Sequence, residues 1–189
     1  MSARLLLIGP PGAGKGTQAV RLRDMLRVPA ISTGDIFRAN IKNETELGLK
    51  VKEIIAGGGY VPDEITDAIV ADRLSEPDCE PGFLLDGYPR TVGQVEALDG
   101  MLDRMGRALD AVLVLTVDTD AVVQRLLKRA EVEGRVDDTE EVIRERMAIY
   151  TRETQPLIDL YRERGLIREV DGMGDVDDVT ARLLQTVRG

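Results

Sequence analysis

The stretch GPPGAGKGT, residues 9–17, decides the fold class of this chain. It follows a short apolar run and has glycines and Lys15 at the spacing of a phosphate-binding loop. In the usual pattern a Ser or Thr follows the lysine directly, and its hydroxyl binds Mg²⁺. Here Gly16 stands at that position, and the first hydroxyl belongs to Thr17. The stretch therefore predicts a nucleotide phosphate site whose hydroxyl is displaced by one residue.

The chemistry of this loop lies mostly in its backbone. Glycine allows the N–H groups of residues 12–17 to surround a β-phosphate closely, and the N-terminus of the following helix adds partial positive charge. Lys15 would reach the β- and γ-phosphates. A plain glycine-rich turn between a strand and a helix is the structural alternative, but the full spacing in that context favours nucleotide binding.

Length and composition limit the number of domains, the class of protein and the compartment that can be expected. The chain has 189 residues, enough for one well-buried core and too few to expect two full domains. With 31% charged and 43% apolar residues, it has the composition of a soluble globule. Its single cysteine, Cys79, excludes an internal disulfide and a multi-cysteine zinc site, which suits a reducing compartment. The N-terminal apolar run is too short for a signal peptide or a membrane span, so we expect a cytoplasmic protein without membrane contact.

The charge balance restricts the partners. A net charge of −9 would repel a polyanion, so nucleic acid is not an expected partner. An anionic substrate would have to be met by locally concentrated positive charge. The expected partners are therefore small molecules bound at a basic site.

Strands and helices are expected to alternate along the chain. Short apolar runs predict strands at 4–8, 28–32, 83–86, 111–117 and 166–170. Helical patterns occupy 16–26, 63–75, 91–105, 119–130, 138–163 and 175–188. Pro156 should bend or break the longest of these helices. The alternation predicts an α/β protein, a three-layer P-loop fold with a five-stranded parallel sheet, in which ligands bind at the carboxyl ends of the strands.

Two segments depart from this alternation. Residues 35–61 contain two polar helical patterns and end near a triple glycine, and residues 130–137 form a charged break between two helices. We interpret both segments as flaps on the core.

A second chemical element is FLLDGYPRT, residues 83–91. Asp86, at the carboxyl end of an apolar strand, can hold Mg²⁺ or its waters beside the phosphate loop. Asp-Gly is also a plain turn signal, but a neighbouring phosphate-loop strand favours the metal role. Arg90 would project from the same strand end.

Together these motifs carry a family resemblance. GPPGAGKGTQ, STGDIFR at 32–38, GGYVPDE at 58–64, LLDGYPRT at 84–91 and the arginines downstream resemble the adenylate kinases in their short-lid form, in order over nearly the whole chain. The resemblance implies a core of residues 1–31, 62–128 and 138–189, a flap at 32–61 that binds the nucleoside monophosphate, and a short lid at 129–137 without zinc.

The resemblance also implies site residues. The donor ATP would contact Gly12, Ala13, Gly14, Lys15, Gly16, Thr17, Arg125, Arg129 and Gly174. The acceptor AMP would contact Thr33, Arg38, Gly59, Tyr60, Val61, Gly87, Tyr88, Pro89, Arg90, Gln94, Arg135 and Arg146. Catalysis would rest on Lys15, Asp86, Arg90, Arg129, Arg135 and Arg146. Mg²⁺ would be held through the nucleotide phosphates and water, with Asp86 and Thr17 nearby and no direct protein ligand.

Several of these residues have a structural alternative. The downstream arginines lie in helical stretches rich in Glu, where surface ion pairs are expected, and we assign Arg144 to such a pair. Thr33 could be a helix N-cap, and Gln94 could be a surface residue of its helix.

The resemblance implies Mg²⁺-dependent transfer of the terminal phosphoryl of ATP to AMP, giving two ADP, by a monomeric phosphotransferase. A UMP/CMP kinase and a non-catalytic nucleotide-binding regulator remain as alternatives. A GTP-binding switch would need an Asn-Lys-x-Asp segment, and neither Asn40 nor Asn43 precedes a lysine. The chain has no histidine, which is compatible with a reaction that needs positioning and charge neutralisation more than a strong base.

Overall fold

The fold is built on one parallel sheet. The structure is a computed structural model that describes residues 3–56, 61–134 and 138–189. Within these residues five strands pair in the order β2-β3-β1-β4-β5, all parallel. They are β1 (Ala3–Ile8), β2 (Ala30–Ser32), β3 (Gly82–Asp86), β4 (Ala111–Thr116) and β5 (Ile167–Asp171). The predicted five-stranded α/β fold is confirmed.

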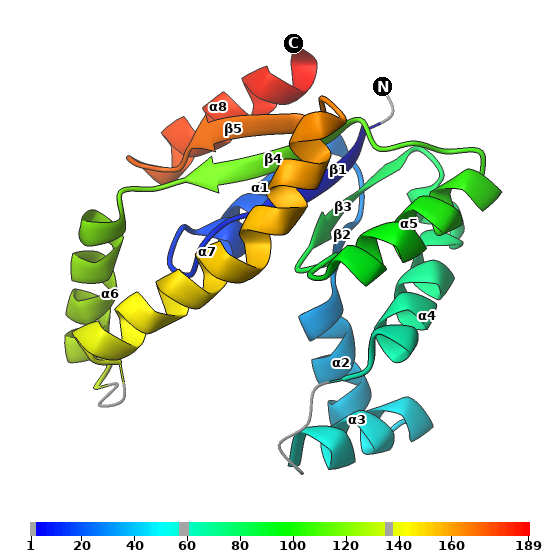
Figure 1. The fold of residues 1–189 in the computed structure, drawn as a ribbon, viewed down its shortest axis with the longest axis horizontal. Coiled ribbons are helices and arrows are strands. Elements are labelled where there is room, and N and C mark those ends of the chain that lie inside the picture. The colour runs from blue at the N-terminus through cyan, green and yellow to red at the C-terminus, as the bar shows by residue number, and fades with distance from the viewer. Residues whose placement is uncertain (1–2, 57–60, 135–137) are drawn as a thin grey trace.

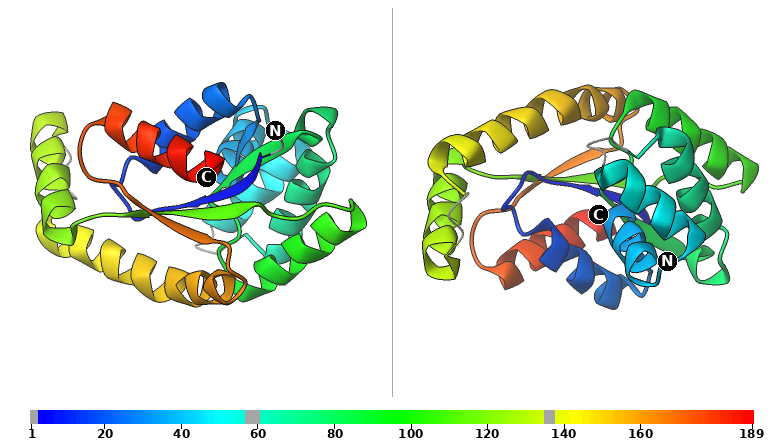
Figure 2. Two further views of the ribbon diagram at one scale, coloured as in Figure 1. Left: turned by 90° about the horizontal axis from the view of Figure 1, so that it is seen from above. Right: turned by 90° about the horizontal axis from the view of Figure 1, so that it is seen from below.

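Helices cover both faces of this sheet, as Figures 1 and 2 show. Helices α1 and α8 pack on one face and α4, α5 and α7 on the other, so the molecule has three layers. The helices are α1 (Lys15–Leu26), α2 (Thr33–Lys42), α3 (Glu46–Ala56), α4 (Asp63–Leu74), α5 (Val92–Arg104), α6 (Thr119–Glu133), α7 (Glu140–Glu163) and α8 (Val176–Arg188). Because both faces are covered, the central strands β1, β3 and β4 contain continuous apolar runs rather than an alternating pattern, and their polar residues stand near the strand ends: Arg4, Asp86 and Thr116.

The helices differ from the expected pattern in two places. Pro156, which was expected to bend or break its helix, does not break α7. Leu157, Ile158 and Tyr161 anchor the following turns in the core, and Pro156 lies on the exposed face, where the carbonyl that loses its partner faces water. Helix α6 also continues to Glu133, past the predicted break at residue 130, and it ends where Gly134 adopts the left-handed conformation of a C-cap.

Helices α2 and α3 extend away from the sheet, as seen in Figure 1, and match the two polar helical patterns. They pack mainly on each other. Helix α2 begins directly after β2, and the side chain of Ser32 caps it by accepting the N–H of Asp35. None of the helices in the described ranges has the length and apolar character that crossing a lipid bilayer needs.

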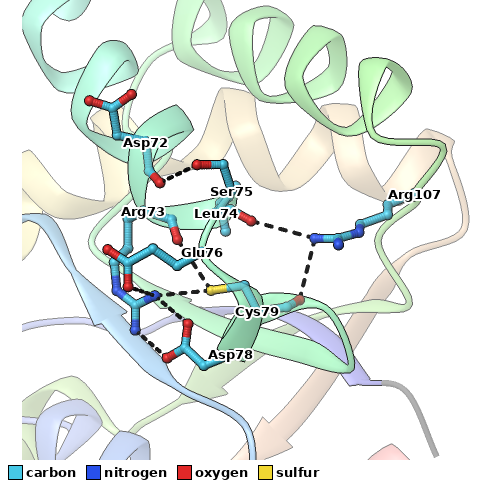
Figure 3. Close-up of polar contacts among 8 residues, drawn as sticks. All are labelled: Asp72, Arg73, Leu74, Ser75, Glu76, Asp78, Cys79 and Arg107. Atoms are coloured by element: carbon cyan, nitrogen blue, oxygen red, sulfur yellow. Dashed lines mark hydrogen bonds and ion pairs between the residues drawn. The ribbon is translucent and has the colours of Figure 1, made fainter.

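Two arginines fix the loop that leads into β3 (Figure 3). Arg73 of α4 donates two hydrogen bonds of 2.8 Å to Asp78 and one of 3.2 Å to Sγ of Cys79. Arg107 donates to the carbonyls of Leu74 and Cys79, both at 3.4 Å. The loop, with its 3-10 turn at Pro77–Cys79, thereby holds the start of β3, which carries Asp86 at its other end.

Burial makes Cys79 chemically inert in the folded state. Loss of hydration raises the pKa of its thiol to about 11, although Arg73 acts in the opposite direction. Because the thiolate is the nucleophile, we expect no reaction with Ellman's reagent at pH 8 in native protein and one thiol per chain in urea. Since the folded pKa exceeds the unfolded one, stability should also fall as the pH rises from about 9 to 11. Rapid stoichiometric labelling of native protein would contradict the burial.

Candidate active site

A cleft of about 630 Å³ opens at the carboxyl edge of the sheet. It is formed by the loop between β1 and α1, the turn after β3, and side chains of α6 and α7. Many of the residues predicted from the sequence line it: Gly12, Gly14, Lys15, Gly16, Thr17, Gly87, Tyr88, Pro89, Arg90, Arg129 and Arg146. Segments that are far apart in the sequence thus meet at the carboxyl ends of the strands, where parallel α/β sheets commonly bind their ligands.

The loop at residues 9–17 presents backbone donors to this cleft. Gly12 and Gly14 both have φ of +78°, and a Cβ at Gly12 would lie 2.8 Å from the side chain of Leu126. Gly14 caps α1 without a side-chain acceptor, so the first N–H groups of the helix face the cleft. Ala13 is buried, and its N–H is bonded to the carbonyl of Pro10 at 3.1 Å. The arrangement suits a phosphate held mainly by the backbone.

Lys15 and Asp86 join the loop to the end of β3. The lysine Nζ lies 2.7 Å from Oδ1 of Asp86, and both side chains are largely buried. Thr17 lines the cleft, and Asp86 lies beside it through its ion pair with Lys15. The Asp86 carboxylate and the Thr17 hydroxyl are hard oxygen donors, the type that Mg²⁺ prefers. The described residues contain no cluster of three or more His, Cys, Asp or Glu that could hold a metal without a nucleotide.

The arginines of the cleft differ in their pairing. Nε of Arg90 donates to the carbonyl of Gly87 at 3.0 Å, and among the described residues neither Arg90 nor Arg129 forms an ion pair. Arg146 pairs with the largely buried Asp138 at 2.8 Å. Arg144 forms exposed ion pairs with carboxylates of α6 and α7, as expected. The cleft therefore offers guanidinium groups whose charge is available to phosphate oxygens.

Thr33 and Gln94 lie against the same turn. Thr33 is buried, and its hydroxyl donates to the carbonyl of Gly87 at 3.5 Å. Gln94 is only 6% exposed, and its amide oxygen accepts the backbone N–H of Arg90 at 2.7 Å. The structural alternatives for these two residues were therefore wrong. The N-cap of α2 is Ser32 and not Thr33, and Gln94 is not a surface residue of its helix.

A family model described as adenylate kinase matches residues 7–166, from β1 to the turn before β5. The chain belongs to the adenylate kinase family. Proteins named adenylate kinase from Nocardioides sp. and Micrococcus luteus are 58% and 59% identical to it over 184 residues, which cover 97% of this chain and 96% and 90% of theirs. A third, from Clavibacter michiganensis, is 56% identical over 186 residues, covering 98% of this chain and 93% of its own.

Some residues implied by the adenylate kinase motifs lie away from the cleft. Arg38 is exposed and pairs with Asp35 within α2. Arg125 is exposed on α6, and Gly174, with φ of +102°, lies on the turn between β5 and α8. Val61 stands just before α4, while three further predicted contacts lie outside the described residues: Gly59, Tyr60 and Arg135.

Other residues of the adenylate kinase cleft were missed by the sequence analysis. Tyr150, Glu153 and Thr154 of α7 line it together with Arg146. Their spacing from Arg146 places them on the same helix face, a signal that could have been read from the sequence. Gln18 was also missed: it is buried after the phosphate loop, where its amide oxygen accepts the hydroxyl of Thr180 at 2.7 Å and links α1 to α8.

A second cavity, of about 460 Å³, lies between β4, β5 and α7 and shares Tyr150 and Thr154 with the cleft. Its two arginines, Arg144 and Arg162, both pair with carboxylates. Their charge is compensated, whereas Arg90 and Arg129 of the cleft form no ion pair among the described residues. The cleft is therefore the better candidate phosphate site of this adenylate kinase family member.

Proposed function

We propose that this chain transfers the terminal phosphoryl of ATP reversibly to AMP, giving two ADP. The observation that carries the proposal is the cleft, where the phosphate loop with Lys15 and the turn with Arg90 face one another. Membership of the adenylate kinase family and the names of its relatives support AMP over a pyrimidine acceptor. The chain is accordingly a phosphotransferase, and its proposed compartment is the reducing cytoplasm, where it would act as a monomer.

The protein's part in the reaction is positioning and charge neutralisation. The backbone of the loop and Lys15 would bind the donor phosphates, and Arg90 the acceptor phosphate. Arg129 and Arg146 would neutralise charge on the moving phosphoryl group. An oxygen of the AMP phosphate is already ionised at neutral pH, so no histidine or other strong base is needed to activate it.

Mg²⁺ fits the donor set of this site. Asp86 and Thr17 would hold it or its waters, since Mg²⁺ usually keeps several waters and binds through one or two carboxylates and substrate phosphates. When bound, the ion neutralises phosphate charge and orients the donor.

Two segments would exclude water from the reaction. In this proposal residues 32–61 close over AMP and residues 129–137 over ATP, which prevents hydrolysis of the donor. Support comes from helices α2 and α3, which pack mainly on each other and extend from the sheet (Figure 1).

An acceptor survey tests the proposal. We expect ATP and Mg²⁺ to support diphosphate formation with AMP at a kcat/KM at least about tenfold above CMP or UMP, a difference of about 1.4 kcal/mol. The reason is that buried polar groups such as Thr33 and the Gln94 amide are left unpaired by the wrong base. Removing Mg²⁺ should abolish transfer, whereas a zinc-selective chelator should leave both folding and transfer unchanged.

The same survey separates the alternatives. Consumption of CMP comparable to that of AMP would move the assignment to a UMP/CMP kinase. Nucleotide binding without turnover of any acceptor would indicate a non-catalytic regulator.

A further inference from the structure

The carboxylate of Asp63 holds two groups of the turn that carries Arg90. Asp63 is the first residue of α4, and its Oδ1 accepts the side-chain N–H of Gln94 at 2.8 Å. Its Oδ2 accepts the hydroxyl of Thr91 at 3.0 Å. Thr91 in turn caps α5 by accepting the N–H of Gln94 at 3.1 Å. Asp63 thus connects the start of α4 to the start of α5.

These contacts allow only one orientation of the Gln94 amide. The backbone N–H of Arg90 can only donate, so it requires the amide oxygen. The carboxylate of Asp63 can only accept, so it requires the amide NH₂. Turning the amide over would set donor against donor at Arg90 and acceptor against acceptor at Asp63. One N–H and one oxygen lone pair of the amide remain for a ligand.

We infer that Asp63 is a positioning residue that sets base specificity by locking the Gln94 amide. The inference rests on the proposed function, in which Gln94 meets the base of the acceptor nucleotide. Adenine presents an amino donor beside the N1 acceptor, which the locked oxygen and N–H match. Hypoxanthine presents a carbonyl acceptor beside an N1–H donor, the reverse pattern. A locked amide therefore accepts AMP and rejects IMP, which differs from AMP only at this edge.

Burial makes the mismatch costly. Gln94 is 6% exposed, so water has little room to replace a bond that the wrong base fails to make. The amide is also held from two different elements, because Asp63 lies in α4 and Arg90 precedes α5. With the Asp63 bond removed, only the Arg90 N–H would oppose rotation of the amide.

The test compares kcat/KM for AMP and IMP in the parent protein and in Asp63→Asn. The parent should prefer AMP by at least a hundredfold. Asparagine has the same shape but can donate as well as accept, so the Gln94 amide can turn and the preference should fall at least tenfold. Asp67→Asn is the matched control, since Asp67 lies one turn further along α4 and, within the described residues, its carboxylate accepts only the hydroxyl of Tyr88, at 2.7 Å. The control should keep the parent ratio within threefold.

The ratio of kcat/KM for AMP to that for IMP separates a positioning role of Asp63 from a purely structural one. Equal losses of kcat/KM for both acceptors in Asp63→Asn, with an unchanged ratio, would overturn the inference. Asp63→Ser, whose hydroxyl is too short to hold the amide, provides a second test with the same expected loss of preference. An unchanged ratio in either variant would be decisive against it. If the parent fails to phosphorylate AMP at all, the proposed function fails instead.

Discussion

Replacing Lys15 by Met is expected to leave a folded protein that has lost most of its turnover. Lys15 stands at the start of α1 and is the lysine among the residues that line the cleft. Methionine keeps an unbranched side chain, and the backbone N–H groups of the loop stay in place. The variant therefore removes the charge that would follow the transferring phosphoryl group. Loss of one such stabilising group lowers kcat by about 10²–10³, or about 2.7–4 kcal/mol.

The measurement is kcat at saturating ATP and AMP, together with a thermal melt. Lys128→Met is the control, because Lys128 is exposed on α6 and does not line the cleft. A lowered melting temperature would report the lost Lys15–Asp86 ion pair, which leaves a largely buried carboxylate without its partner, rather than the chemistry. A Lys15→Met turnover within threefold of the parent would remove Lys15 from the proposed reaction.

The sheet could be predicted from the sequence because each strand is marked by a short apolar run within its own residues. The central strands contain continuous apolar runs, as required when helices cover both faces, and the predicted limits agree closely with β1, β3 and β4. Helix limits were less predictable, since they depend on packing against other elements. Buried residues after Pro156 keep α7 continuous. Their packing is not visible in the local pattern.

The site could be predicted in part for a similar reason. The loop at 9–17 and the turn at 87–90 each follow a strand, and neighbouring parallel strands bring their carboxyl ends to one edge. The bond between Asp63 and Gln94 joins residues 31 apart on two helices, and no periodic pattern signals it. Exposed arginines such as Arg38 and Arg125 are also difficult to assign, because a long side chain on a helix serves a surface ion pair as readily as a ligand.

Arg90→Ala is expected to lower turnover by about 10³, the scale typical of arginines that stabilise a transferring phosphoryl group. The guanidinium of Arg90 lines the cleft and has no ion-pair partner among the described residues. Its backbone N–H, which Gln94 accepts, survives the substitution. Because the side chain is exposed, the melting temperature should stay close to that of the parent. The effect should therefore appear in kcat/KM for AMP and not in stability.

Two further variants separate charge from geometry at this position. Arg90→Lys keeps the positive charge but loses the planar fork that binds two phosphate oxygens, so its turnover should lie between those of the parent and Arg90→Ala. Arg144→Ala removes an arginine whose partners are surface carboxylates, and its turnover should stay within twofold of the parent. A purely structural Arg90 would produce the reverse pattern, a lowered melting temperature with normal kinetics, because its side chain would then only support the turn through the carbonyl of Gly87.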